Sequence, residues 1–343
     1  MRRFEHGGDI YRHPGAVDFS ASLNPLGMPP AARQALVSQV DAFERYPDPA
    51  CAELVAAIAC FEGVREAWVV PTAGATDAFA RICTALRPQR ALVCAPSYSG
   101  YEQALKQVDC AVQVHRLRAD EGFQLTEAFA EDLHTGIDLA FIANPNNPTG
   151  RCVPQSVLRG LLAQAQQTGA TVVLDECFVD LSDGEQSNAL LDEFRNLVIV
   201  KALTKTYALA GLRVGYALSA NEALVARLWE AGQPWAVSVP AQLAGVASLR
   251  DTAYLQQSLR LIRQERARLR GALEAQGLTV LPSDTNYLLF RGPHGLADAL
   301  LGRGILIRSC DNFEGLDGRW YRIAVRTAYE NGQLIAALGE VLS

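Results

Sequence analysis

Lysine is rare in this sequence, which limits where lysine chemistry could occur. Among 31 Lys and Arg residues only three are lysines, namely Lys106, Lys201 and Lys205. Lys205 lies in the segment KALTKTYALAGLRVGY, eight residues before Arg213. A lysine in apolar surroundings can have its pKa lowered and become a nucleophilic amine. The alternative interpretation is a surface lysine whose stem packs on apolar neighbours.

Three other segments place polar groups at turns. Asp175 and Glu176 end the apolar run TVVL, and a buried acid is costly unless a cation or a donor accompanies it. The segment NPNNPTG (144–150) carries side-chain amides that can donate to a ligand oxygen, although a simple multiple turn would explain it too. The segment TAGATDAF (72–79) places a glycine before an expected helix start, where free N–H groups suit a phosphate.

Together these segments supply an amine, a buried acid, amide donors and a phosphate cradle. Pyridoxal phosphate requires such a set, because its aldehyde needs an amine for a Schiff base and its pyridinium nitrogen needs an acid partner. The sequence therefore predicts pyridoxal phosphate as the cofactor. The five scattered histidines lack ligand spacing, so no metal site is expected.

The elements that must position these groups follow from the apolar pattern. Short continuous apolar runs are typical of sheet strands covered on both faces, and helical spacing separates several of them, as in 77–86 and 154–167. Strands that alternate with helices predict an α/β fold with a three-layer α/β/α, mostly parallel sheet and a ligand site at the carboxyl ends of the strands. The runs are 67–71, 90–96, 111–117, 139–145, 171–176, 197–203 and 213–219.

The pattern changes after Ala220. We predict a long helical stretch over roughly 239–275 and a final helix over 330–342, with strand-like runs between them at 286–291, 305–310 and 321–326. This part reads as a smaller α+β domain. The predicted division is a large cofactor domain over 41–238 and a small substrate-clamping domain formed by 1–40 and 239–343.

Composition sets outer limits on function. The chain has 343 residues and a formal net charge of −6, without blocks of Lys or Arg, which argues against nucleic acid or an anionic membrane as a partner. No run of 18 apolar residues occurs, and residues 1–15 lack the apolar core of a signal peptide. The eight cysteines show no C-x-x-C pair and are expected to be reduced thiols. These observations predict a cytoplasmic protein.

The succession NPNNPTG, DE-x-F and TK-x-x-x-L-x-GLR-x-GY resembles the class I and II aminotransferases of the fold type I pyridoxal phosphate superfamily, over essentially the whole chain. The resemblance implies that Lys205 forms the Schiff base and Asp175 partners the pyridinium nitrogen. It also implies a homodimer, because Tyr46 in RYPDP matches a tyrosine that reaches the phosphate of the neighbouring subunit. The other cofactor contacts that it implies are Asn147 with the phenolate oxygen, Tyr98 on the ring, Thr204 beside the lysine, and Ala75, Thr76 and Arg213 around the phosphate. Two departures stand out: Ala202 replaces a hydroxyl residue, and Phe178 replaces a tyrosine.

Within the superfamily, four features are similar to the threonine-phosphate decarboxylase type of cobalamin biosynthesis. They are HGG at residues 6–8, DFSASLNPLG at 18–27, Phe178, and R-x-AVR-T-x-x-EN at 322–331. Between Gly8 and Asp18 the chain is shorter than that pattern. The resemblance implies decarboxylation of O-phospho-L-threonine, or O-phosphoserine, to the amino alcohol phosphate used in the cobalamin nucleotide loop. The alternative is a histidinol-phosphate-type aminotransferase using 2-oxoglutarate or glutamate, a type that usually lacks HGG.

A doubly anionic substrate also fits the arginines near the C-terminus. We expect Arg308 and Arg322 on neighbouring short strands, and alternation along YRIAVR would put Arg326 on the same face as Arg322. Guanidinium groups bind carboxylate and phosphate bidentately. The resemblance implies that the substrate contacts are His6, Gly7, Asn24, Asn147, Arg308 and Arg322. Arg326 is either a further contact or part of a structural salt bridge. A regulatory protein that has lost catalysis would need a DNA-binding module, which the sequence does not show.

Overall fold

The computed structural model describes residues 6–343, and its largest element is a sheet built from every strand predicted between residues 67 and 219. The strands are β2 (Val69–Thr72), β3 (Arg90–Ala95), β4 (Ala111–Arg116), β5 (Leu139–Ala143), β6 (Thr171–Asp175), β7 (Leu197–Ala202) and β8 (Gly215–Leu218). Their order is β2-β8-β7-β6-β5-β3-β4, and only β8 runs antiparallel to its neighbours. The predicted mostly parallel sheet is confirmed.

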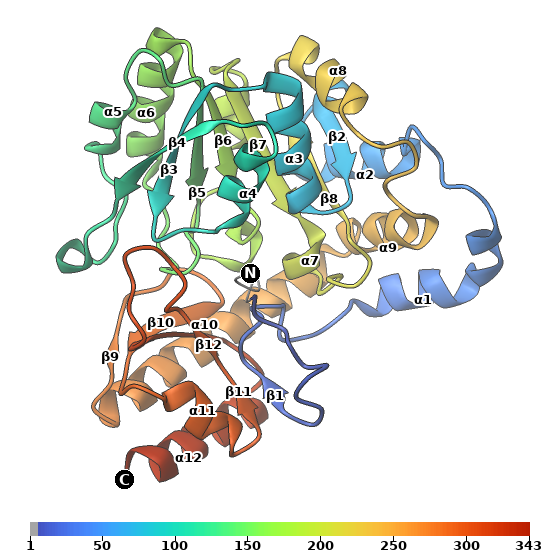
Figure 1. Cartoon of the computed structure of the whole chain (residues 1–343). Helices are drawn as coiled ribbons and strands as arrows, with labels where there is room; N and C mark the ends of the chain where they lie inside the picture. The colour runs from blue at the N-terminus through green and yellow to red at the C-terminus, as the bar shows by residue number, and fades with distance from the viewer. Residues whose placement is uncertain (1–5) are drawn as a thin grey trace.

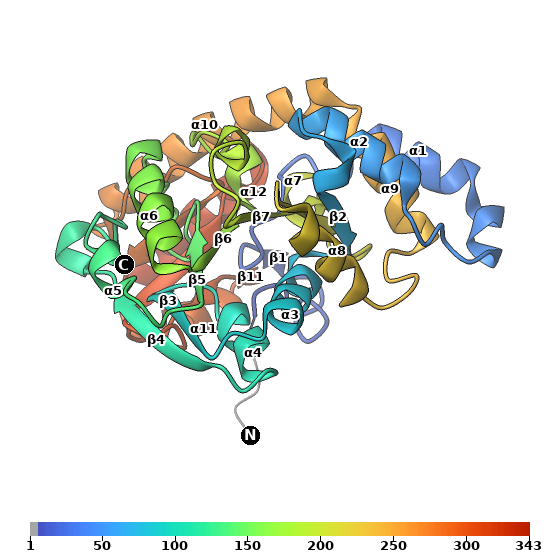
Figure 2. The same ribbon diagram turned by 90° about the horizontal axis from the view of Figure 1, so that it is seen from above.

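Helices cover both faces of this sheet, as Figure 1 and Figure 2 show. Successive side chains of a strand point to opposite faces; accordingly Phe141 belongs to one core cluster and Ile142 to the other. One face carries α3 (Ala75–Leu86), α4 (Gly100–Lys106) and α8 (Glu222–Glu230). The opposite face carries α2 (Ala52–Glu62), α5 (Phe129–Asp132), α6 (Gln155–Thr168) and α9 (Val239–Leu249). The three-layer α/β/α architecture is therefore confirmed.

The C-terminal third forms a second, smaller sheet with the strand order β12-β13-β10-β9. Its antiparallel strands are β9 (Thr279–Val280), β10 (Tyr287–Arg291), β12 (Arg308–Ser309) and β13 (Trp320–Ala324). The helices α10 (Thr252–Ala275), α11 (Leu296–Leu301) and α12 (Ala328–Leu342) pack around it. The run expected over 305–310 serves two sheets, because β11 (Ile305–Leu306) pairs with the N-terminal β1 (Val17–Asp18) while β12 pairs with β13.

The helical stretch expected over 239–275 is present as two helices, α9 and α10, with a break at Arg250 and Asp251. The Asp251 side chain accepts a hydrogen bond from the backbone N–H of Tyr254 and so caps a new helix. Buried residues of α9 share the core cluster of α2 and the large sheet, and α1 (Pro30–Ser38) packs on α9. The predicted division at residue 239 assigned α9 to the small domain; the division of the chain stays a prediction.

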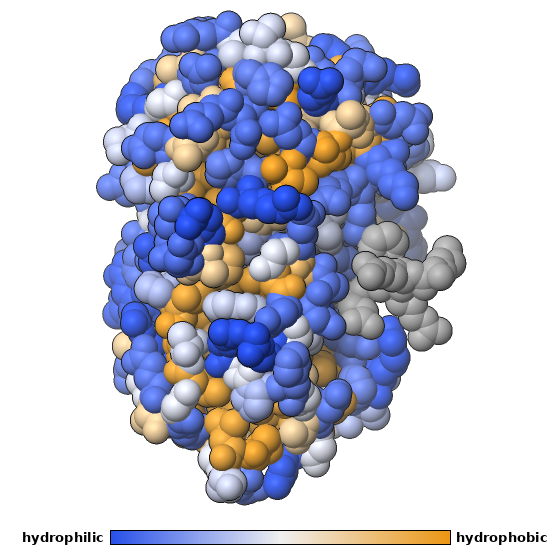
Figure 3. Space-filling model, turned by 60° about the vertical axis from the view of Figure 1, so that its left-hand side comes forward, coloured by the Kyte–Doolittle hydropathy of each residue, from blue (hydrophilic) through white to orange (hydrophobic). Residues whose placement is uncertain are grey.

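The remaining helical elements are short, and α7 (Leu203–Thr206) is the one that matters for the site because it follows β7 directly. The 3₁₀ turns are η1 (Val40–Glu44), η2 (Glu66–Trp68), η3 (Ala119–Glu121), η4 (Val179–Leu181) and η5 (Asn188–Leu191). Within residues 6–343, none of the helices has the length and apolar character needed to span a bilayer. Figure 3 views the side that carries α5 and α6, where hydrophilic residues cover most of the surface and apolar residues show between them.

Candidate active site

A cavity of about 490 Å³ lies at the carboxyl ends of β5, β6 and β7 and is closed by residues of the small sheet. This is where parallel sheets of this type place ligands. Thirteen of the residues predicted for the site line it, namely His6, Gly7, Ala75, Thr76, Tyr98, Asn147, Asp175, Phe178, Thr204, Lys205, Arg213, Arg308 and Arg322. Asn24, Tyr46 and Arg326 do not appear among the lining residues.

Lys205 lies in the single turn of α7, immediately after β7, and faces the cavity. Burial lowers its pKa to about 8, and the positive charges of Arg322 and Arg213 act in the same direction. Its Nζ lies 5.9 Å from the centroid of the Phe178 ring. A lysine with this pKa provides a useful fraction of neutral amine near neutral pH, so Lys205 is suited to act as a nucleophile. The alternative of a surface lysine does not describe this position.

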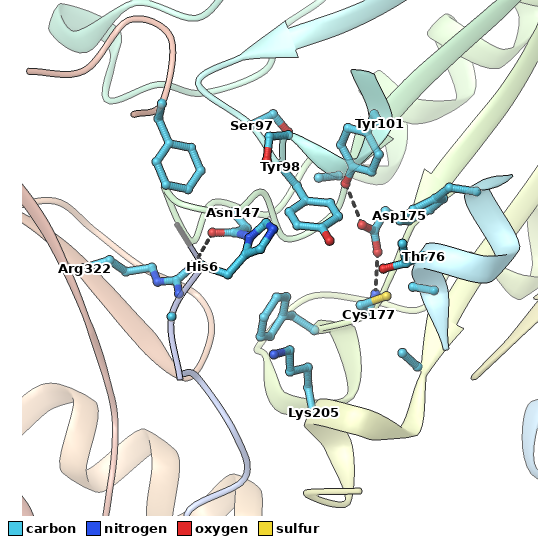
Figure 4. Close-up of a pocket in the computed structure, with 18 of the residues that line it drawn as sticks. His6, Thr76, Ser97, Tyr98, Tyr101, Asn147, Asp175, Cys177, Lys205 and Arg322 are labelled. Atoms are coloured by element: carbon cyan, nitrogen blue, oxygen red, sulfur yellow. Dashed lines mark hydrogen bonds between the residues drawn. The ribbon is translucent and has the colours of Figure 1, made fainter. Parts of the chain in front are cut away.

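Asp175 is the last residue of β6, and two donors hold its buried carboxylate (Figure 4). The Tyr101 hydroxyl donates to Oδ2 at 2.5 Å, and the Cys177 backbone N–H donates to Oδ1 at 3.0 Å. Burial raises the pKa of Asp175, while these hydrogen bonds oppose the rise. Because each carboxylate oxygen can accept more than one hydrogen bond, the group can still receive a protonated ring nitrogen.

The start of α3 forms an anion site. Gly74 precedes the helix with φ = 89°, and a Cβ there would lie 2.7 Å from Nη2 of Arg213. The first N–H groups of a helix have no partner within it and favour negative charge; in α3 these include Ala75 and Thr76. Arg213 itself has a left-handed backbone (φ = 59°), which is uncommon for a residue with a side chain. The guanidinium and the helix terminus therefore converge where a phosphate would bind.

Aromatic side chains form the walls between the amine and the acid. Tyr98 lies edge-on to Tyr101, with ring centroids 5.5 Å apart, and Phe178 lies edge-on to Tyr287 at 5.0 Å. A Cβ on Gly100 would clash with the Tyr98 ring, so a glycine is required beside it. Tyr98 and Phe178 thus flank the cavity that holds Lys205 and Asp175, and the residues present fit the aromatic ring of pyridoxal phosphate.

Two guanidinium groups mark the opposite end of the cavity. Arg308 and Arg322 are direct cross-strand partners of β12 and β13, which confirms their predicted placement on neighbouring strands. Arg322 donates to Asn147 Oδ1 and, from Nη2, to the Ser20 carbonyl at 2.9 Å. Arg308 donates to Asn312 Oδ1 at 2.7 Å. Two largely buried cations on one wall suit a ligand with two anionic groups.

His6 lines the same end of the cavity as these arginines. Its pKa is lowered by burial and then by the positive charges of Arg308, Lys205 and Arg322. Its ring centroid lies 6.2 Å from that of Tyr98. His6 therefore favours its neutral form, which can donate one hydrogen bond to a ligand without adding charge.

The other predicted contacts have different surroundings. Asn24 is buried outside the cavity, where its Nδ2 donates to the Thr206 carbonyl and to Ser258 Oγ, both at 2.8 Å. Tyr46 is 81% exposed and lies against Trp235. Arg326 lies beyond the end of β13 at Ala324 and does not line the cavity; its guanidinium pairs with Glu330, which is the salt-bridge alternative predicted from the sequence.

Several lining residues were missed in the sequence. No site role was predicted for Tyr101 or Cys177. Tyr101 lies three residues from the predicted contact Tyr98, and Cys177 lies two residues from Asp175. The Tyr-x-x-Tyr spacing at a strand end was the available signal for Tyr101. Other lining residues without a predicted role include Ser20, Ser97, Asn312 and Phe313.

A family model described as aminotransferase class I and II matches residues 14–338. The chain is 38% identical to threonine-phosphate decarboxylase of Salmonella typhimurium, over 98% of this chain and 96% of that relative. It is 36% identical to histidinol-phosphate aminotransferase 1 of Cupriavidus pinatubonensis, over 96% and 89%. A solved structure of histidinol-phosphate aminotransferase from Clostridium acetobutylicum superposes with a TM-score of 0.88 at 27% identity, covering 94% of this chain and 98% of that one. L-threonine-O-3-phosphate decarboxylase from Porphyromonas gingivalis gives 0.84 at 27%, with the same coverage.

Proposed function

The chain belongs to the class I and II aminotransferase family, and from this premise we propose that it is a pyridoxal-phosphate-dependent decarboxylase of O-phospho-L-threonine or O-phosphoserine. The product would be the amino alcohol phosphate used in the cobalamin nucleotide loop. The observation that carries the proposal is the pairing of Arg308 and Arg322 across β12 and β13, in a cavity that also contains Lys205 and Asp175.

The cofactor site is assigned to the residues whose chemistry matches it. When bound, pyridoxal phosphate supplies an aldehyde that condenses with amines and a ring that withdraws electrons from a bound substrate. Lys205 is the amine that would hold the aldehyde, and Asp175 would accept the ring N–H. The phosphate would bind at the start of α3 together with Arg213, and Tyr98 would cover the ring.

At the substrate end, the chain's task is orientation. Arg308 and Arg322 would bind the phosphate and the carboxylate, with His6 as a neutral donor beside them. The direction in which the carboxylate is held decides whether carbon dioxide or a proton leaves the α-carbon. After carbon dioxide leaves, the Lys205 amine is the group placed to return a proton to that carbon, since its lowered pKa lets it gain and lose a proton near neutral pH.

The alternative is an aminotransferase acting on histidinol phosphate, which is the activity named for relatives at 36% identity. Three features favour the decarboxylase. His6 and Gly7 of the HGG segment line the cavity, Phe178 carries no hydroxyl to offer the cofactor, and the relative at 38% identity matches nearly the whole chain.

A direct assay separates the two. Purified protein with pyridoxal phosphate is incubated with O-phosphothreonine, and carbon dioxide and amine are measured; histidinol phosphate with 2-oxoglutarate is tested in parallel. We expect stoichiometric carbon dioxide and amine in the first reaction. Transamination without carbon dioxide release would contradict the proposal.

Borohydride reduction tests the cofactor site separately from the substrate. Reduction of the loaded protein should attach the cofactor to the peptide that contains Lys205. Lys201 is four residues away in the same segment and serves as an internal comparison. Attachment at Lys106 or Lys201 would overturn the assignment.

We also propose that the protein works as a homodimer in a reducing, cytoplasmic compartment. Helix α1 and η1 project from the body of the molecule (Figures 1 and 2). Exposed apolar residues gather on and beside them, namely Val37, Val40, Phe43, Tyr46 and Trp235. A second copy would cover this surface and receive Tyr46 at its phosphate site.

Light scattering should give twice the mass of 37.1 kDa, and Tyr46→Ala should weaken cofactor binding. All eight cysteines are free, as a reducing compartment favours.

A further inference from the structure

Arg326 is one of the predicted substrate ligands, but all three nitrogens of its guanidinium donate to partners outside the cavity. Nε and Nη2 donate to Glu330 Oε1 at 2.9 and 2.5 Å, and Nη1 donates to the Asp18 carbonyl at 2.9 Å. The guanidinium carbon also lies 5.8 Å from the centroid of the Phe19 ring. A planar guanidinium can serve these partners together, whereas an ammonium group cannot reproduce its fork.

The carboxylate that receives Arg326 is itself fixed at the start of α12. Glu330 Oε2 accepts hydrogen bonds from the Thr327 hydroxyl at 2.6 Å and from its backbone N–H at 3.2 Å, completing a capping box. Burial raises the pKa of Glu330, yet the hydrogen bonds from Arg326 and Thr327 leave it lowered. Glu330 is therefore a rigid, charged anchor for the Arg326 side chain.

Asp18, at the other end of this contact, organises the turn Asp18–Ala21. Its Oδ1 accepts hydrogen bonds from the Ser20 N–H at 2.8 Å, the Ser20 hydroxyl at 2.6 Å and the Ala21 N–H at 3.3 Å. The Ser20 hydroxyl oxygen in turn accepts from the Gly8 N–H at 2.7 Å. The turn thus connects the Arg326 anchor to the HGG segment.

The same turn reaches the substrate end of the cavity. Ser20 and Ala21 line it, and the Ser20 carbonyl accepts from Arg322 Nη2 at 2.9 Å. A Cβ on Gly7 would clash with that carbonyl oxygen, so the HGG segment is in close contact with it. One carbonyl therefore both orients Arg322 and supports the segment that carries His6, which lies near Arg322 and Asn147 in Figure 4.

We propose that Arg326 is a positioning residue: anchored by Glu330, it holds the turn Asp18–Ala21 so that Arg322 and His6 are set for the anionic groups of the substrate. The part of this inference that concerns substrate rests on the proposed function. The part that concerns the turn does not, because the contacts that fix it involve only residues of the chain. Arg326 acts on the substrate through Ser20, not by contact.

The test compares Arg326→Gln with Arg270→Gln. Arg270 pairs with Glu274 at the same i, i+4 spacing on an exposed part of α10, so its substitution breaks an equivalent ion pair away from the cavity. Hydrogen exchange of the cofactor-loaded protein reports on the turn whatever the substrate is. We expect faster exchange at Gly8, Ser20 and Ala21 in Arg326→Gln and unchanged exchange in Arg270→Gln. Unchanged exchange in both variants would overturn the proposal.

Kinetics then separate positioning from direct binding. For Arg326→Gln we expect KM for O-phosphothreonine to rise about tenfold or more, since small displacements of binding groups have large effects, with a smaller change in kcat. A raised KM with unchanged exchange would mean that Arg326 contacts substrate directly and would contradict the proposal. If the protein instead uses histidinol phosphate, the exchange result still stands and KM is measured for that substrate.

A charge-swapped double variant, Arg326→Glu with Glu330→Arg, separates the effect of the Arg326 hydrogen bond to Asp18 from the effect of the ion pair with Glu330. It can retain an ion pair, but a carboxylate at position 326 cannot donate to the Asp18 carbonyl. Because Glu330→Arg also removes the acceptor of the α12 capping box, we expect the protein to stay folded with a lower thermal midpoint than the parent, while exchange at Ser20 and Ala21 stays fast and KM stays raised. Full recovery of both would show that the ion pair alone matters and would overturn the proposal.

Discussion

Lys201 and Lys205 lie four residues apart, one at the end of β7 and the other in α7, yet their surroundings move their pKa values in opposite directions. Lys201 is 1% exposed, and its Nζ lies 2.9 Å from Glu62 Oε2 and 3.4 Å from Asp180 Oδ1. Burial alone would lower its pKa, but Asp180, Glu62 and Glu176 raise it above the usual value. Burial also lowers the pKa of Lys205, and there the neighbouring charges include Arg322 and Arg213, which lower it further.

This difference shows that the sign of the neighbouring charges determines whether a buried lysine keeps or loses its proton near neutral pH. Lys201 remains a cation and pairs with the buried carboxylates Glu62, Glu176 and Asp180, which connects α2 to the ends of β6 and β7. The Tyr216 hydroxyl and Asn188 Nδ2 complete the shell of Glu62. Lys205 can lose its proton near neutral pH and face a ligand. One lysine therefore supports the fold and the other is available for chemistry.

Replacing Lys205 should have the largest effect on activity. In Lys205→Arg the new guanidinium would stay charged at all relevant pH values and could not act as the amine nucleophile. For this variant we expect turnover to fall by at least about 10³-fold, with little change in the denaturant midpoint. Steady-state assays with cofactor and O-phosphothreonine, together with urea unfolding, measure both quantities. Turnover at the parental rate would show that another group performs this role.

Replacing Lys201 should give the reverse pattern. Lys201→Met leaves Glu62, Glu176 and Asp180 without their cation, and removing one partner of a buried ion pair costs about 3–5 kcal/mol. We expect this loss in the free energy of unfolding, measured with denaturant at pH 7.5. Protein that remains folded should retain most of its turnover.

Lys106→Met is the matched control, because Lys106 is exposed at the end of α4. Its substitution should change the free energy of unfolding by no more than about 0.5 kcal/mol. Equal effects at positions 106 and 201 would contradict a structural role for the buried cluster.

Glu176, which belongs to the Lys201 cluster, should make the free energy of unfolding depend on pH. Its pKa is raised to about 7, chiefly by burial, even though Lys201 opposes the rise. Between its ordinary pKa of 4.5 and about 7, the folded state holds a proton that the unfolded chain has released. Stability from this group is thus full below about pH 4.5 and is lost as pH rises through about 7. In Glu176→Gln the free energy of unfolding should fall less steeply across this window, as thermal or urea unfolding at several pH values would show; an identical slope would contradict it.

The large sheet and the two main site residues could be predicted because the relevant signals are local. Lys205 and Asp175 each follow an apolar run that forms a strand, and neighbouring strand ends bring them to one edge of the sheet. The Lys201 cluster could not be predicted, since Glu62 is 139 residues away on another element and only tertiary packing brings it near. Long-range pairs of this kind leave no spacing signal in a single sequence.

In the small domain the sequence pattern did not show where each element ends. Alternation along YRIAVR predicts one face for Arg322 and Arg326, but it does not show that β13 ends at Ala324 or that Arg326 pairs with Glu330 at the start of α12. The break between α9 and α10 was readable, because Asp251 three residues before Tyr254 is a capping position, but the apolar pattern continues across it. Periodicity locates elements better than it locates their ends.

The smallest effect on cofactor binding is expected from removing a hydrogen-bond donor to Asp175. This prediction compares Asp175 with the carboxylates that pair with Lys201. The carboxylates around Lys201 are held by a cation, whereas Asp175 is held by the neutral Tyr101 hydroxyl and the Cys177 N–H. Tyr101→Phe removes one donor and leaves the other, so the pKa of Asp175 should rise further and a larger fraction of its carboxyl groups should be protonated, a form that no longer offers an anion to the ring N–H. The Tyr101 hydrogen bond is present without cofactor, so most of its contribution of about 1.5–3 kcal/mol should be lost from the free energy of unfolding, and the dissociation constant for pyridoxal phosphate should rise by less than about tenfold. Equilibrium dialysis measures it, and Tyr321→Phe is the control because the Tyr321 hydroxyl donates to the Pro293 carbonyl and does not line the cavity. Equal binding by the parent and Tyr101→Phe would show that the Cys177 N–H alone is sufficient to hold the acid.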